Sequence, residues 1–152
     1  MYTFRKWYIQ ECFDKALREI GYPPLVLAPK KVFGYKAKLT EGYHLDGLSN
    51  YSMRSIWINK NQENDIALKG TIWHEILHCI FYGFPEWWVE IASYKLARRK
   101  KKRFGWEDGD DYGKSLLGKT LDYVPERKEL ISTMRHIVYD MNNAQNRSIS
   151  ID

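Results

Sequence analysis

The sequence predicts an α+β fold in one domain, residues 1–152, with a small, mostly antiparallel sheet packed on a central helix pair and with further helices near both ends. Two patterns predict this class. Helical spacing of apolar residues marks both ends and the centre of the chain, and short apolar runs between Gly, Asp and Asn clusters fill residues 25–60. In addition, an apolar fraction of 44% in 152 residues is enough for one core without disulfides.

The N-terminal part of the chain predicts one helix followed by short strands. Over residues 3–20, charged residues separate apolar ones at near-helical spacing, and Gly21 with Pro23-Pro24 ends the pattern. The apolar positions are Phe4, Trp7, Tyr8, Phe13, Leu17 and Ile20. The chain then changes to short runs typical of strands, at Leu25–Leu27, Val32–Tyr35 and Tyr51–Ile58.

Two further helices are predicted on either side of a tight break. Residues 66–81 form a long apolar stretch without proline, which is typical of a largely buried helix. Residues 82–85 interrupt it, and Pro85 suits the first turn of a second helix from Glu86 to about Lys102. After a loop at 105–120, we expect a last helix over about residues 125–142. Its apolar side consists of Leu130, Ile131, Met134, Ile137, Val138 and Met141.

One motif predicts chemistry: His74-Glu75-Ile76-Leu77-His78, an H-E-x-x-H pattern inside the buried helix. Residues four apart on a helix differ by roughly 40° and rise about 6 Å, so both imidazoles reach one point beside the helix. Two neutral nitrogens there favour a Zn²⁺ ion, and Glu75, on the flank of the same face, is the candidate general base. The alternative is a pair of core histidines with ordinary hydrogen bonds. We favour the metal, because three ionisable groups in an apolar helix each need a partner.

A catalytic zinc ion takes a third protein ligand and keeps one position open for water. If the second helix folds back on the first, counting equally away from the turn places position 91 opposite the midpoint of the two histidines, which favours Glu90. Glu86 is the next candidate, and its alternative role is that of a first-turn acid favoured by the helix dipole. Less favoured ligands are His44, His136 and an aspartate of the 105–120 loop.

Hydrolysis at such a site needs a base and an oxyanion donor besides the metal. The zinc ion polarises the scissile carbonyl, and Glu75 accepts the proton of the attacking water and passes it to the leaving amine. A further donor stabilises the developing oxyanion. Spacing does not select among the candidates, which are Tyr43, His44, Tyr112, His136 and Tyr139.

Charge and cysteine content indicate which binding partners and which cellular compartment to expect. The 24 Lys and Arg against 19 Asp and Glu give a net charge of +5, and the excess lies in the run Arg98–Arg103. This run is typical of a solvated helix end, and the alternative is a weak contact with nucleic-acid phosphates. The two cysteines, Cys12 and Cys79, are expected to be reduced and buried. We expect a cytoplasmic protein, because no apolar stretch is long enough for a membrane span or a signal peptide.

The motif and its downstream context resemble a known family. Trp-His-Glu-Ile-Leu-His at 73–78, followed by Val-Glu-Ile-Ala-Ser at 89–93, looks like the glutamate-zincin pattern. The order of elements is similar to the minimal metallopeptidase domains of the SprT-like and ImmA/IrrE-like groups and of small phage-encoded HExxH proteins. The resemblance covers roughly residues 50–98. The third histidine of the metzincin motif is absent, because position 84 is Phe.

The resemblance implies a zinc-dependent metallopeptidase that acts on a peptide or protein substrate. It also implies that the segment before the motif helix, Ser55–Asn59, forms the edge of the sheet at the cleft, where an extended peptide adds as one more strand. A rival interpretation is a protein- or DNA-binding regulatory protein whose zinc site is structural or non-catalytic. Glu75 favours the enzyme, because a purely structural site does not need a carboxylate beside the metal.

Overall fold

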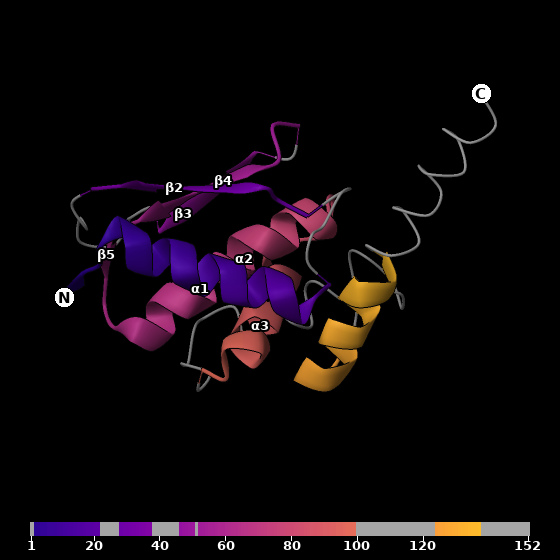
Figure 1. The fold of residues 1–152 in the computed structure, drawn as a ribbon. Coiled ribbons are helices and arrows are strands. Elements are labelled where there is room, and N and C mark those ends of the chain that lie inside the picture. The colour runs from indigo at the N-terminus through magenta and orange to yellow at the C-terminus, as the bar shows by residue number, and fades with distance from the viewer. Residues whose placement is uncertain (1, 22–27, 38–45, 51, 100–123, 138–152) are drawn as a thin grey trace, which may run out of the picture.

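A computed structural model of the protein describes residues 2–21, 28–37, 46–50, 52–99 and 124–137. Within these ranges the predicted α+β class is confirmed, with small sheets lying over a layer of helices (Figure 1). The strand expected at Leu25–Leu27 and the loop expected at 105–120 lie outside the described residues.

The main sheet has three strands, β2 (Lys31–Tyr35), β3 (Gly47–Asn50) and β4 (Ser55–Asn59), in the order β2-β4-β3. It is mixed, because β4 runs parallel to β2 and antiparallel to β3. A second, two-residue antiparallel pair joins β1 (Tyr2–Thr3) to β5 (Asn61–Gln62). The predicted strands at 32–35 and within 51–58 are confirmed, whereas β1, β3 and β5 were not expected from the sequence.

The prediction that Ser55–Asn59 lies at the edge of the sheet is wrong. This segment is β4, the central strand, and both of its sides are paired. Its isoleucines, Ile56 and Ile58, are fully buried against the helices, as suits a strand with neighbours on both sides. Among the described residues, the edge that adjoins the motif helix is β3, and Gly47 on β3 is buried beside that helix.

Three labelled helices support the sheet: α1 (Lys6–Glu19), α2 (Asp65–Ile80) and α3 (Glu86–Ala97). A further helical segment covers residues 127–137. The expected extension of α3 to about Lys102 is wrong, because Arg98 takes a left-handed backbone with φ of 56° and ends the helix. The backbone N–H of Arg99 then donates to the carbonyl of Tyr94, at 2.8 Å.

The start of α2 is fixed by a side-chain cap. Asn64 precedes the helix in an extended conformation, and its Oδ1 accepts a hydrogen bond from the backbone N–H of Ala67 at 2.8 Å. From this cap onward, the apolar residues of α2 pack into one core with α1, β4 and α3. The largest fully buried members on α2 are Leu68, Ile72, Ile76 and Leu77.

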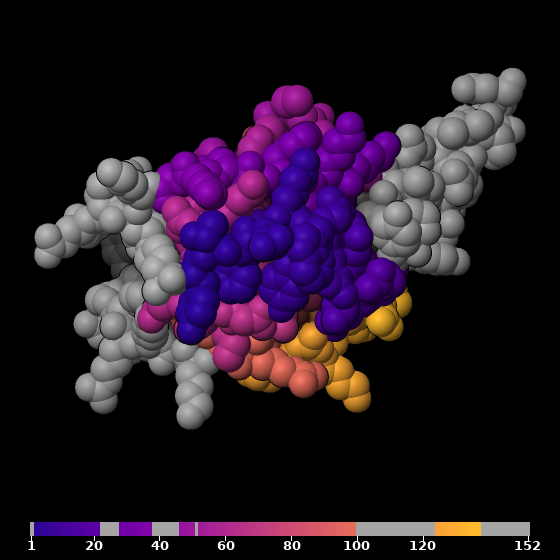
Figure 2. All heavy atoms as spheres, turned by 60° about the vertical axis from the view of Figure 1, so that its left-hand side comes forward, coloured from indigo at the N-terminus to yellow at the C-terminus, as the bar shows by residue number. Residues whose placement is uncertain are grey.

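The remaining helices close the core around α2. Figure 2 shows α1, in indigo, covering one face of the molecule. The segment 127–137 buries Leu130 and Met134, as its apolar pattern predicts. Arg127 fixes this segment by donating to the backbone carbonyl of Leu96 and to Glu19. No helix in the described ranges is both long and apolar enough to cross a membrane.

Candidate metal centre

The two motif histidines of α2 meet as the helical spacing predicts. Their ring centroids are 4.7 Å apart, and the Nε2 atoms of His74 and His78 lie 3.0 Å from each other. The imidazole of His74 is largely buried, with its side chain 13% exposed, and that of His78 is 25% exposed. Both rings therefore point to one place beside α2, at the edge of the core.

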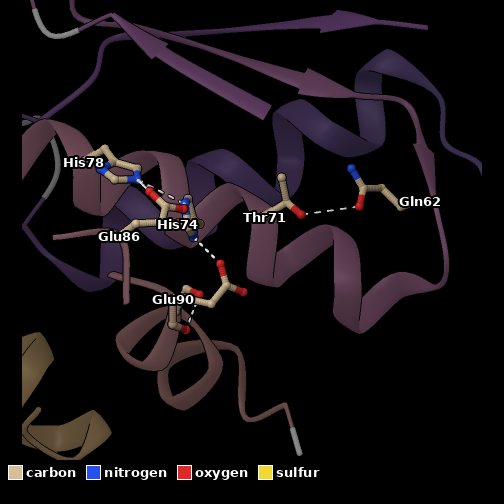
Figure 3. A network of polar contacts seen from close by, with 7 residues as sticks. Gln62, Thr71, His74, His78, Glu86 and Glu90 are labelled. Atoms are coloured by element: carbon tan, nitrogen blue, oxygen red, sulfur yellow. Dashed lines mark hydrogen bonds and ion pairs between the residues drawn. The ribbon is translucent and has the colours of Figure 1, made fainter. Parts of the chain in front are cut away.

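The carboxylate that faces both of these nitrogens belongs to Glu86, the first residue of α3. Its Oε1 lies 2.7 Å from Nε2 of His74, and its Oε2 lies 2.8 Å from Nε2 of His78 (Figure 3). These three residues form a cluster whose ligand-type atoms all lie within 4.8 Å of one another. A metal ion could be held by this group of two histidines and one carboxylate.

Glu90, which the count from the turn favoured as the third ligand, contacts the opposite side of His74. Its Oε2 lies 2.9 Å from Nδ1 of that ring, while the Nε2 atom faces Glu86 (Figure 3). A carboxylate on Nδ1 holds a neutral imidazole with its proton on Nδ1 and its lone pair on Nε2. The structure thus brings both predicted glutamates to the histidines, in two different positions.

The two positions follow from the register of the helix pair. Glu86 contacts His78, Glu90 contacts His74, and a Cβ atom added at Gly70 would lie 3.8 Å from that of Ala97. Residues progressively later on α3 thus meet residues progressively earlier on α2, as in an antiparallel hairpin. Counting the same number of residues in both directions from the turn at 82–85 placed the histidines opposite position 91. In the structure, the histidines face residues about one helical turn earlier, at the start of α3.

Aromatic packing in the turn accounts for this shift. The rings of Phe81, Phe84 and Trp88 form a mutual cluster with centroids 4.8 to 5.1 Å apart. Gly83 allows the tight reversal with φ of 90°, and Pro85 lies directly before the first residue of α3. Because Phe81 and Trp88 pack on each other across the turn, α3 starts close to the end of α2.

In the described part of the chain, no lysine or arginine pairs with the two glutamates of this cluster. Burial lowers the pKa of His74, but the carboxylates of Glu86 and Glu90 reverse this effect and raise it to about 10. The hydrogen bonds from both histidines hold the pKa of Glu86 well below its usual range. Without a metal, the two carboxylates thus need a proton on His74, and a divalent cation would supply the same positive charge at the shared Nε2 face.

Glu75 lies beside the cluster and is almost fully buried, with 6% of the residue exposed. Burial raises the pKa of its carboxyl and Glu86 raises it further, whereas His74 and His78 lower it. Ser49 of β3 also lowers this pKa. This buried carboxylate and His74 line the same cavity.

Gly47 of β3 makes room for this carboxylate. A Cβ atom at that position would lie 2.9 Å from both Cγ and Oε2 of Glu75 and 3.1 Å from Cγ2 of Thr71. The φ of Gly47 is not positive, so the close approach of the strand to α2, rather than the backbone conformation, requires glycine there. No pattern in the sequence could have identified Gly47, because it contacts Glu75 only through the pairing of β3 with β4 and its packing on α2.

A cavity of about 190 Å³ joins these groups. Its lining includes His74, Glu75, Glu86 and Glu90, together with Asp46, Gly47, Gly70, Thr71 and Arg99. The hydroxyl of Thr71 is held away from it by a hydrogen bond to Oε1 of Gln62, at 3.3 Å (Figure 3). Sequence reasoning had placed Arg99 only in a basic run, and did not assign it to this cavity.

The other candidates from the sequence fall into two groups. His136 is described and exposed, and it does not belong to the cluster of His74, His78 and Glu86. The remaining oxyanion and ligand candidates lie outside the described residues: Tyr43, His44, Tyr112, Tyr139 and the 105–120 loop. The expectation for the cysteines is confirmed, because Cys12 and Cys79 are both free and buried.

Comparison with known proteins adds no relative. No protein-family model, curated protein or solved structure matches this chain. The geometry described above is therefore the basis for assigning a function.

Proposed function

We propose that the protein is a zinc-dependent metallopeptidase in which His74, His78 and Glu86 hold the ion and Glu75 is the general base. The observation that carries the proposal is the convergence of two imidazole Nε2 atoms and one carboxylate within 2.7 to 3.0 Å, next to a buried glutamate. Two histidines and one glutamate are a common ligand set of zinc peptidases, in which the remaining position admits water.

The donor set fits zinc. Imidazole nitrogen and carboxylate oxygen are its ordinary ligands, and Glu86 contributes one of the two negative charges that neutral histidines do not supply. Glu90 takes the outer position, where its carboxylate accepts the Nδ1 proton of His74 and orients the ring. The proposal thus assigns the third ligand to Glu86, the second candidate from the sequence, in place of Glu90, which counting from the turn favours.

The chain's own residues divide the work of hydrolysis. A bound zinc ion supplies Lewis-acid polarisation of the scissile carbonyl and makes a water molecule acidic near neutral pH. Glu75 accepts the proton of the attacking water as the C–O bond forms, and delivers it to the nitrogen as the C–N bond breaks. Its burial favours this exchange, because a carboxylate too well stabilised by water takes up a proton reluctantly.

The strand nearest to the candidate metal centre and Glu75 is β3. Asp46, directly before it, and Gly47, its first residue, both line the cavity, and β3 is the edge of the three-stranded sheet among the described residues. We place the extended peptide substrate along β3, where backbone hydrogen bonds do not depend on its sequence. This role moves from Ser55–Asn59, which is central in the sheet.

The test combines metal exchange with one variant. Zinc-loaded protein is incubated with a mixture of unstructured peptides, and new termini are identified by mass spectrometry. Cleavage should stop with a chelator and return with zinc. Glu75→Gln should retain zinc but hydrolyse peptides at least about 100-fold more slowly, since general bases contribute about 10²- to 10⁴-fold. Zinc binding without cleavage of any peptide would favour the rival function, a binding or regulatory protein with a non-catalytic metal.

A further inference from the structure

The candidate metal centre occupies only one end of its cavity. From His74, the cavity continues along α2 past Thr71 and Gly70 to Arg99, which follows the end of α3. The Nη1 atom of Arg99 lies 3.8 Å from the position of a Cβ added at Gly70. Because Gly70 is one helical turn before His74, the guanidinium lies about 6 Å further along the axis of α2. A cation thus faces the same space as His74, about one helical turn away.

Arg99 is held in place by ring stacking, and no hydrogen bond joins its guanidinium to another residue in the described part of the chain. Its guanidinium carbon lies 4.6 Å from the centroid of the Tyr94 ring, and its side chain is only 18% exposed. Among the described residues, its one carboxylate contact is with Glu63 at 3.9 Å, which is too long for a hydrogen bond. A stacked, largely buried guanidinium in this state presents its planar donors to whatever enters the cavity.

We propose that Arg99 binds a carboxylate of the substrate within one residue of the scissile bond. This inference rests on the proposed function, because it takes the carbonyl to lie at the histidine end of the cavity. One extended residue spans about 3.5 Å and a hydrogen bond adds about 3 Å, so a carboxylate on the residue after the scissile carbonyl comes within reach of Arg99. The carboxylate has two sources with the same chemistry, the free C-terminus of a peptide or the side chain of an Asp or Glu.

The acidic groups of the cavity do not prevent a substrate carboxylate from binding at Arg99. Glu86 and Glu90 are engaged with the histidines at the other end, and Asp46 has interactions of its own. Arg99 is the only cation among the described residues that line the cavity. An anionic group is therefore best accommodated at Arg99, where a bidentate pair satisfies both partners.

A binding experiment tests the assignment independently of turnover. The probes are three hydroxamates of equal length, which bind zinc through the same group and end in a carboxylate, a neutral amide or an amine. Their affinities for zinc-loaded protein are measured by calorimetry in the wild type, in Arg99→Gln and in Arg98→Gln. Arg98 is a matched control, because it is the adjacent cation in the chain and lines a different cavity.

The wild type should bind the carboxylate probe about 10- to 100-fold more tightly than the amide, the range of a charged hydrogen bond. Arg99→Gln should lose this preference and Arg98→Gln should keep it. Equal binding of the two probes in the wild type, or an unchanged preference in Arg99→Gln, would overturn the assignment. Tighter binding of the amine probe would also overturn it, and would indicate Asp46 as the specificity residue.

Peptide substrates then separate the two sources of the carboxylate. One arm compares peptides that end directly after the scissile bond with their C-terminal amides, and the other compares Glu with Gln at the same internal position. A preference for either carboxylate that Arg99→Gln removes supports the assignment and names its source. If the hydroxamate preference is present and no peptide is cleaved, the peptidase proposal fails and Arg99 still binds a carboxylate. If peptides are cleaved without either preference, the peptidase proposal stands and the assignment of Arg99 to a substrate carboxylate fails.

Discussion

Two cavities lie on different faces of α2, and their charges differ. The first is the candidate metal centre, whose lining carries the acids Asp46, Glu75, Glu86 and Glu90 and one cation. The second, of about 380 Å³, lies between α1, α2, the end of α3 and the start of the 127–137 segment. Its lining carries one acid, Glu19, and four cations: Lys15, Lys69, Arg98 and Arg127.

The difference lies in how the charges are neutralised. At the second cavity, Lys69 pairs with Asp65 at 2.9 Å and Arg127 with Glu19 at 2.6 Å, over an apolar floor that includes Trp73. These are ordinary partly exposed pairs, which contribute little to stability. At the first cavity, Glu86 and Glu90 contact histidines and, among the described residues, no lysine or arginine, so their charge is balanced only if a proton or a metal is added. Charge imbalance in a buried cluster, rather than the number of charges, thus distinguishes the candidate metal centre from the second cavity.

The largest expected effect is the response to metal removal. Zinc at about 1,000 times its dissociation constant stabilises a protein by about 4 kcal/mol, so chelation should lower the melting temperature by about 10 °C. His74→Ala should abolish this response, because it removes a ligand. Glu19→Gln, which changes a charge at the second cavity, should leave it intact. Scanning calorimetry with and without zinc measures both responses. A zinc response in His74→Ala equal to that of the wild type would show that zinc does not bind at the first cavity.

A smaller effect is expected from filling the space that Gly47 leaves for Glu75. In Gly47→Ala, the new methyl group overlaps Cγ and Oε2 of Glu75 and displaces the base. Hydrolysis should fall by up to about 100-fold, as for misplacement of a catalytic group by about 1 Å, while zinc binding changes little.

The matched control for Gly47 is Gly34 on β2. A Cβ there would lie 2.6 Å from Cε of Lys60, the far end of a flexible side chain that can move away. Gly34→Ala should therefore keep normal turnover. Equal losses in the two variants, measured as kcat/KM on one peptide, would show that sheet distortion rather than contact with Glu75 is responsible.

The smallest effect belongs to the pair at the second cavity and depends on pH. Partial burial alone would raise the pKa of Asp65, but the hydrogen bond from Tyr8 and the pair with Lys69 outweigh it and lower the pKa below 3.8. The stabilisation is therefore present above pH 3.8 and is lost as the pH falls through the folded-state pKa. Because the pair is 46% and 43% exposed, we expect less than about 1 kcal/mol.

Urea unfolding of the wild type and of Asp65→Asn between pH 7 and pH 2 measures the stabilisation that ionised Asp65 contributes. The difference in unfolding free energy should be largest near neutral pH and should shrink toward pH 2. A difference that instead grows on acidification would contradict the assigned direction of the pKa shift.

Local patterns in the sequence were sufficient for the helices and for the meeting of the two histidines. The apolar spacing that predicts α1, the proline-free stretch that predicts α2 and the four-residue spacing of His74 and His78 all act within one element. The end of α3 was not predictable in this way. A helix-compatible basic run continues past Ala97, but Arg98 takes a left-handed conformation that no local signal requires.

Properties that depend on tertiary contacts could not be predicted. The strand β3, Gly-Leu-Ser-Asn, has neither alternation nor β-branched residues, and it exists because β4 offers it a partner. Likewise, β4 looks the same from sequence whether it is central or at an edge. The roles of Glu86 and Glu90 depend on a helix register fixed by the packing of Phe81 on Trp88, and counting residues cannot supply that contact.

We assign the third ligand of the proposed metal centre to Glu86, and not to Glu90, beside His74 and His78. Calorimetric titration of metal-free protein with zinc tests it most directly, in the wild type, Glu86→Gln and Glu90→Gln. The wild type should bind one ion per chain. Glu90→Gln should weaken binding by about 10- to 100-fold, as loss of an outer carboxylate does, and Glu86→Gln should weaken it more. No binding by the wild type, or a larger loss in Glu90→Gln than in Glu86→Gln, would contradict the account.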